Sequence, residues 1–187
     1  VEFMHGSENR YLSDGKATGF MKNYAGGGYA FVAMLPNKGV SISEYIESLD
    51  GKKLHDMLSD PQRCEVITKL PKFETEYDVE MSDILKGMGM SNAFDINSAD
   101  FSGIGTFRDN NICIGKVIHK TFISVGESGT KAGAATIIDM IAGSAADGED
   151  REPPKEVFLD RPFVYMLIDT ENNVPFFIGT MMNVNGD

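Results

Sequence analysis

The residues that carry acid–base, nucleophilic or metal chemistry in enzymes are scattered along this chain. The three histidines, His5, His55 and His119, lie far apart, and none falls in a metal-binding spacing such as HExxH. The stretch GESGT at 126–130 approaches the nucleophile motif GxSxG, but Thr130 stands where the second glycine belongs. No phosphate-binding GxxxxGK[ST] sequence occurs. We therefore predict that the chain has no catalytic site, metal site or cofactor.

The isolated reactive side chains are better explained as structural residues. His119 lies within an apolar stretch next to Lys120, which favours a core histidine with a satisfied hydrogen bond. The two cysteines, Cys64 and Cys113, each lie in an apolar run, and no CxxC pair occurs. This pattern predicts buried free thiols rather than a disulfide or a zinc site.

The segment with the most unusual composition is 127–154, ESGTKAGAATIIDMIAGSAADGEDREPP. Connections of this length inside a compact domain are usually functional or disordered. If the segment were a strand, alternate side chains would face opposite sides. One alternate set is uncharged and comprises Thr130, Ala132, Ala134, Thr136, Ile138 and Met140. The other set carries the charges of Lys131 and Asp139. This alternation predicts a strand with one buried face.

Two other interpretations of the segment remain open. A helix is compatible with its alanines and with the shared face of Ile137, Ile138 and Ile141. Its glycines and the β-branched run 136–138 count against a helix. A disordered linker is the third possibility. We favour a strand or loop, and the sequence suits more than one state.

The composition limits the classes of partner. A chain of 187 residues with 42% hydrophobic residues can form one domain, or a large part of one, with a core. No apolar run approaches the length of a membrane span. The formal net charge of −11 argues against binding nucleic acid or an anionic membrane through bulk charge. The opening VEFMHGSENRYL has the character of a strand within a domain, so we expect the true N-terminus to lie upstream.

Periodicity predicts an α+β domain with more strand than helix. Two strands are expected around the turn Gly26–Gly28, and the apolar run 31–35 predicts a strand covered on both faces. Ser41 and Glu44 have the spacing of a capping box, which predicts a helix that Gly51 ends, before a second helix over 52–58.

The remaining elements follow from the same rules. We expect strands over 64–79, broken at Pro71, a short helix over 81–89 that ends at a glycine, a long strand over 112–127, and a hairpin of strands 163–168 and 175–179 around the turn DTENN.

Six stretches of this sequence resemble, in order, those of the serpin family. They are LPKF at 70–73, ADFSGI at 99–104, VIHKTFISV at 117–125, the hinge GESGTKAGAAT at 126–136, DRPFVYMLID at 160–169 and PFFIG at 175–179. They belong to the C-terminal half of a serpin. The resemblance implies the serpin fold, whose large mixed β-sheet accepts a reactive-centre loop, here 127–157, as an extra strand. It also implies that the N-terminal half is absent from this chain or lies on another chain, and we expect it as a tightly bound partner.

The resemblance implies suicide inhibition of a serine protease and no enzyme activity. A protease cleaves the loop, and the loop then inserts into the sheet and traps the acyl-enzyme. The implied hinge comprises Glu127, Gly129, Thr130, Ala132, Ala134, Ala135 and Thr136. His119 resembles a histidine that latches the point where the sheet opens. The alternative is a non-inhibitory carrier, storage protein or chaperone.

The family's spacing from Glu127 implies that the cleaved bond joins Gly143 and Ser144. Small residues here, including Ala142, suit an elastase-like or subtilisin-like protease. Cleavage at Met140 or Ile141 is an alternative, and counting back from DRPF points instead to Arg151 and a trypsin-like target. The serpin resemblance favours a secreted or extracellular protein, since serpins are often secreted. No signal peptide in this chain supports that compartment.

Overall fold

The structure is a computed structural model that describes residues 2–108, 110–127, 129–130 and 153–184. Its contacts divide the chain into two compact units. The first unit comprises residues 1–73 and 124–187, and the second comprises residues 74–123. Each unit is described separately below.

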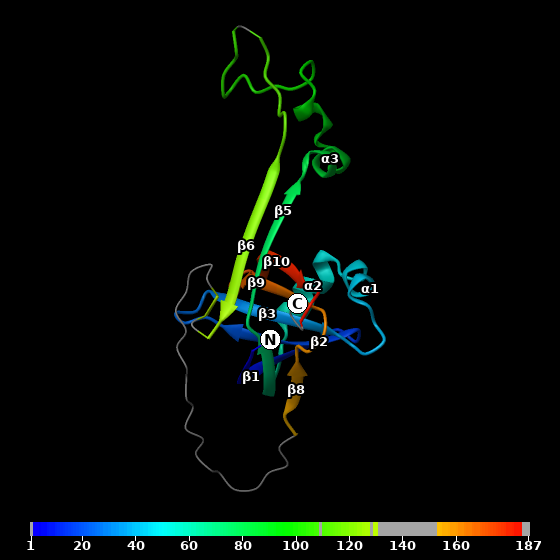
Figure 1. Cartoon of the computed structure of the whole chain (residues 1–187), viewed down its shortest axis with the longest axis vertical. Helices are drawn as coiled ribbons and strands as arrows, with labels where there is room; N and C mark the ends of the chain where they lie inside the picture. Colours follow the sequence, from blue (N-terminus) through cyan, green and yellow to red (C-terminus); the bar gives the residue numbers. More distant parts are fainter. Residues whose placement is uncertain (1, 109, 128, 131–152, 185–187) are drawn as a thin grey trace. The chain divides into compact units, whose positions relative to one another are not determined.

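The first unit is built on a seven-stranded mixed sheet with the order β10-β9-β3-β2-β1-β4-β8 (Figure 1). The strands are β1 (Phe3–Ser13), β2 (Ala17–Asn23), β3 (Tyr29–Pro36), β4 (Gln62–Pro71), β8 (Lys155–Phe158), β9 (Phe163–Asp169) and β10 (Val174–Met181). All neighbours are antiparallel except β4 and β8, which run parallel. The expected hairpin of the two C-terminal strands is confirmed as β9 and β10.

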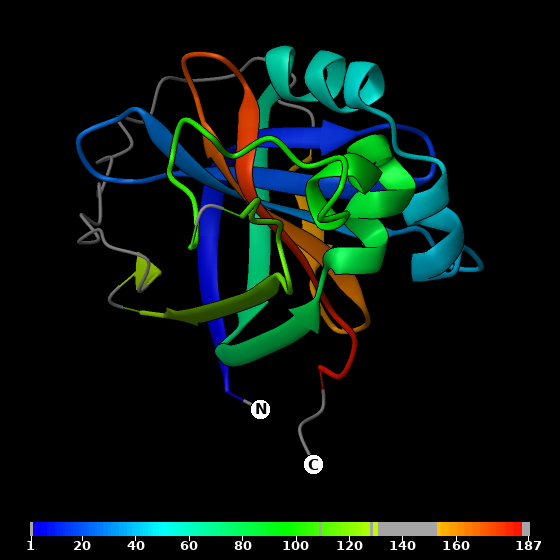
Figure 2. The same cartoon turned by 90° about the horizontal axis from the view of Figure 1, so that it is seen from above.

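Strand β1 joins two parts of this sheet. It pairs with β4 over most of its length and with β2 only from Tyr11 to Ser13. Its register against β4 shifts between Glu8 and Arg10. Such a bulge bends a strand, and Figure 2 shows β1, in dark blue, changing direction along its length.

Strand β3 lies at the centre of the core, as its apolar run predicts. Every residue from Ala30 to Pro36 is buried. One face of β3 joins β9 and the two helices in a cluster that includes Val32, Met34 and Tyr45. On the other face, Phe31 packs against Phe20 with ring centroids 6.5 Å apart. The predicted turn before β3 is confirmed, and Gly26, Gly27 and Gly28 all have positive φ.

Two helices cover one face of the sheet (Figure 1). Helix α1 (Ile42–Glu47) begins at the predicted capping box, because Ser41 and Glu44 satisfy each other's backbone N–H groups. The prediction that Gly51 ends this helix is wrong. Gly51 is the first residue of helix α2 (Gly51–Ser59), because the Asp50 carboxylate accepts the N–H of Lys53 and caps the new helix.

The close approach of β2 and β3 requires a glycine at position 19. A Cβ at Gly19 would lie 2.2 Å from the Ala33 carbonyl oxygen and 2.4 Å from Met34 Sδ. The carbonyl cannot move without breaking the strand pairing, so Gly19→Ala should destabilise the fold by about 3 kcal/mol, or roughly 10 °C in melting temperature. Thermal unfolding followed by circular dichroism measures this. Gly51→Ala is the matched control, because nothing lies within 4 Å of a Cβ there. Equal effects of both substitutions would contradict the prediction.

The second unit contains most of β5 (Phe73–Glu80) and β6 (Ile118–Gly126), with α3 (Ser82–Leu85), a π-helical turn (Lys86–Met90) and a 3-10 turn (Ser91–Phe94) between them. The expected short helix ending at a glycine is confirmed, because Gly89 adopts φ 103° and separates the helical turns that begin at Ser82 from the 3-10 turn after it. No described helix is long and apolar enough to span a membrane.

The expectation of a strand from residue 112 onward is also only half right, since β6 begins at Ile118. The physical reason lies at Val117. Its N–H donates to Ser82 Oγ at 3.1 Å, and its carbonyl accepts the N–H of Met81 at 2.8 Å. These bonds tie Val117 to the start of α3 instead of to a neighbouring strand.

Candidate functional site: the hinge and the two ends of the loop

The candidate site is the start of the small-residue segment, where the chain turns back on itself. Strand β6 ends at Gly126, and a short strand β7 (Gly129–Thr130) pairs with it antiparallel, with Val125 opposite Thr130 and Gly126 opposite Gly129. Gly129 has φ 102°, which only glycine adopts without strain. Strand β7 is the third strand of a sheet with the order β5-β6-β7. The predicted hinge therefore begins as a strand beside β6.

A lysine holds the turn of this hairpin. Lys72 Nζ lies 3.0 Å from Glu127 Oε1 and 2.9 Å from Glu2 Oε1. Hydrogen bonds from Lys72 to Glu2 and then to Glu127 raise the pKa of the lysine above its ordinary value. Lys72 follows the last residue of β4, so the hinge glutamate is attached to the end of that strand. The sequence placed Lys72 in the motif LPKF but did not indicate its ion-pair partners.

The far end of the segment is attached to the same strand. Strand β8 runs parallel to β4, with Val66 opposite Lys155 and Lys69 opposite Phe158. Lys69 Nζ also lies 4.5 Å from the centre of the Phe158 ring, and the N–H of Leu159 donates to the Lys69 carbonyl at 2.9 Å. Residues 62–72 thus hold both ends of the segment, one by an ion pair and one by a strand ladder.

The sequence of the chain matches a known family. A family model described as Serpin (serine protease inhibitor) matches residues 1–184. The chain belongs to the serpin family. Serpins are mostly protease inhibitors rather than enzymes, and the family also contains non-inhibitory members.

Serpin relatives share both sequence and fold with this chain. An uncharacterized serpin-like protein of Thermococcus kodakarensis is 34% identical over 160 residues, which are 86% of this chain and 36% of that protein. Iris of the tick Ixodes ricinus is 33% identical over 91% of this chain and 44% of its own length. The crystal structure of the thermophilic serpin tengpin in its native state has a TM-score of 0.83 and 43% identity, covering 98% of this chain and 46% of tengpin. The chain therefore spans less than half the length of these serpins.

The structure places only part of the predicted serpin site. Glu127, Gly129 and Thr130 lie together at the β6–β7 hairpin. The other hinge residues, Ala132, Ala134, Ala135 and Thr136, lie outside the described residues. So do all the candidates for the cleaved bond: Met140, Ile141, Ala142, Gly143, Ser144 and Arg151. The predicted loop range 127–157 includes β7 and most of β8.

The prediction that His119 is a buried core residue is wrong, because the described part of the chain leaves its side chain exposed. His119 is exposed on β6, together with its neighbours Ile118 and Lys120. These three residues precede the buried part of the strand, and no described element covers them. The latch role implied by the serpin resemblance stays a prediction. The two cysteines are free as predicted, but each is half-buried.

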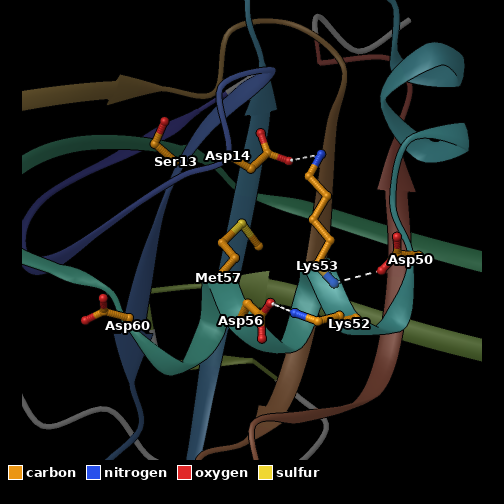
Figure 3. Close-up of a pocket in the computed structure, with 8 residues that line it drawn as sticks. All are labelled: Ser13, Asp14, Asp50, Lys52, Lys53, Asp56, Met57 and Asp60. Carbon is orange, nitrogen blue, oxygen red and sulfur yellow. Dashed lines mark hydrogen bonds and ion pairs between the residues drawn. The ribbon is translucent and has the colours of Figure 1, made fainter.

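A second polar site lies between the β1–β2 turn and α2 (Figure 3). Lys53 extends from the helix to Asp14, with Nζ 3.0 Å from Asp14 Oδ2. Asp14 Oδ1 accepts the N–H groups of Lys16 and Ala17 at 3.0 and 2.8 Å. No group of residues able to hold a metal ion occurs among the described residues. The contacts made by Asp14 instead give it a structural role, since they tie the turn to the helix.

Removal of this carboxylate should destabilise the fold. Burial alone would raise the pKa of Asp14, but the hydrogen bonds from Lys53, Ala17 and Lys16 outweigh it and hold the pKa below its ordinary value. Asp14→Ala should therefore lower stability by about 2 kcal/mol at pH 7. Because the folded pKa is depressed, this contribution is present above the unfolded value of about 4 and is lost as the pH falls through the folded pKa.

Denaturant unfolding of the wild type and Asp14→Ala at pH 7 and pH 3 measures this effect. Asp56→Ala is the control, because its pair with Lys52 is exposed on both sides and should contribute little. A penalty for Asp14→Ala that stays constant down to pH 3 would contradict the role of the charge.

Proposed function

We propose that this chain is the C-terminal portion of a suicide-type inhibitor of a serine protease. The observation that carries the proposal is the attachment of both ends of the segment 131–152 to the one stretch 62–72. A loop held at both ends can be attacked by a protease without separating from the protein. Membership of the serpin family supports the same function.

The proposed reaction begins as ordinary proteolysis. The protease's serine oxygen attacks the carbonyl carbon of Gly143, the bond to the Ser144 nitrogen breaks, and that nitrogen leaves as an amine. Gly143 is then held as an ester on the protease. Hydrolysis of this ester would release an active protease. Inhibition requires the freed segment to insert before water attacks the ester.

Insertion continues the pairing that β7 begins. Thr130 stands opposite Val125, and Val125 is buried. If the ladder continued, positions 132, 134 and 136 would follow position 130 on one face of the strand. The residues there are Ala132, Ala134 and Thr136, which are small and uncharged. Extended, the stretch from Gly129 to Gly143 spans roughly 46 Å. That length is enough to carry a bound protease across a domain.

The proposed target is an elastase-like or subtilisin-like protease. Ala142, Gly143 and Ser144 are all small, which suits a narrow specificity pocket. A target that cleaves after Met140 or Ile141, or a trypsin-like target that cleaves after Arg151, is distinguished by sequencing the new amino terminus. The remaining portion of the serpin fold is the second proposed partner, because the chain spans 46% of the tengpin chain.

The test is to mix the complete serpin with elastase, subtilisin and trypsin. We expect an adduct that survives SDS for elastase or subtilisin, with cleavage between Gly143 and Ser144. Clean cleavage without any adduct for all three proteases would contradict inhibition and favour a non-inhibitory carrier, storage or chaperone role.

A further inference from the structure

The lysine that contacts the hinge has two partners, and they lie in different parts of the chain. Glu127 lies in the hairpin turn, and Glu2 lies just before β1. The backbone N–H of Lys72 donates to the Glu2 carbonyl at 2.9 Å, so the Glu2 main chain is bound beside the lysine. The main chain of Glu2 is therefore held beside Lys72 by a bond that does not involve the hinge.

The charges of Lys72 and its two carboxylate partners do not balance. One ammonium group with three N–H donors can bind two carboxylates, but two carboxylates and one ammonium leave a net negative charge. The two glutamate carboxylates therefore repel each other while both are bound to the same ammonium group. Both are largely exposed, with side chains 72% and 70% accessible, so water and salt limit the effect to a few-fold.

We propose that Glu2 is a positioning residue that acts as the second counter-ion of Lys72 and eases the release of Glu127 from that lysine. When Glu127 leaves, Lys72 keeps a partner, and the repulsion between the two carboxylates is relieved. The consequence for inhibition depends on the proposed function, because hinge release matters there for loop insertion. The repulsion between the two carboxylates bound to Lys72 does not depend on that function.

This inference predicts opposite effects for two glutamates on one lysine. Glu127→Gln weakens the hold on the hairpin and should open it. Glu2→Gln leaves Lys72 with Glu127 alone and should close it. If Glu2 only anchored the lysine, both substitutions would open the hairpin.

Hydrogen exchange measured by mass spectrometry on the uncleaved, complete serpin tests this without a protease. At low ionic strength we expect amide exchange in the β6–β7 hairpin to slow about three-fold in Glu2→Gln and to speed up about three-fold in Glu127→Gln. Both changes should shrink at 1 M salt. Glu47→Gln is the matched control, since Glu47 is exposed on α1 and has no ion pair in the described part of the chain.

Faster exchange in Glu2→Gln, or a change no larger than in Glu47→Gln, would overturn the proposal. So would an effect of Glu2→Gln that persists in a Lys72→Met background, because the lysine must carry it. A second measurement, the number of inhibitor molecules consumed per protease trapped, should rise in Glu2→Gln. Absence of any adduct with the wild type would contradict the proposed function and leave the exchange result to decide the role of Glu2.

Discussion

Cleavage between Gly143 and Ser144 is expected to raise the melting temperature of the complete serpin by tens of degrees. An inserted strand gains main-chain hydrogen bonds along its edges, each with a net contribution of about 1 kcal/mol. Over some ten residues this approaches 10 kcal/mol, which alone corresponds to roughly 10 °C or more for a serpin about twice the length of this chain, and burial of the inserted apolar side chains adds to it. Thermal unfolding before and after digestion with elastase measures the change.

The chain offers a control cut close to the hinge. Cleavage after Lys131 leaves only residues 127–131 attached to the end of β6, so almost nothing remains to insert. We expect this product to melt no higher than the intact serpin. If the cut at Gly143 also left the melting temperature unchanged, loop insertion would be wrong. The proposal that the uncleaved serpin is metastable, held by a kinetic barrier rather than by equilibrium stability, would then be wrong as well.

If the proposed inhibition is right, a single charge on the inward face of the loop should convert the inhibitor into a substrate. Ala134 belongs to the alternate set that would face the core, and Ala135 belongs to the other set. Burial of an unpaired carboxylate costs several kcal/mol, and each 1.4 kcal/mol slows a step about ten-fold. Ala134→Glu should therefore slow insertion at least ten-fold, while Ala135→Glu keeps its charge in solvent.

The measurement compares two products on an SDS gel: the fraction of elastase recovered as a stable adduct, and the fraction of the serpin that is cleaved without forming an adduct. Ala134→Glu should give mostly cleaved product, and Ala135→Glu should behave like the wild type. The two variants have the same charge at adjacent positions, so a general effect of charge cannot separate them. Equal behaviour would show that the segment does not alternate as a strand.

The local features of this serpin could be predicted from its sequence because near neighbours in the chain determine them. The capping box of Ser41 and Glu44 operates within one helical turn, and Gly26–Gly28 can adopt positive φ wherever they lie. The apolar run of β3 required burial on both faces. The alternation of small residues after Gly129 likewise follows from residue order alone.

Only the tertiary structure determined the contacts between residues that are far apart in the chain. No pattern links Glu2, Lys72 and Glu127, yet the ammonium of Lys72 binds both carboxylates because β1, β4 and the β6–β7 hairpin converge there. The hydrogen bonds of Val117 to Met81 and Ser82 likewise place the start of β6 after Val117, although the local sequence favours an earlier start of the strand. An ion pair depends on the distance between charges in space, and sequence periodicity contains no information about that distance.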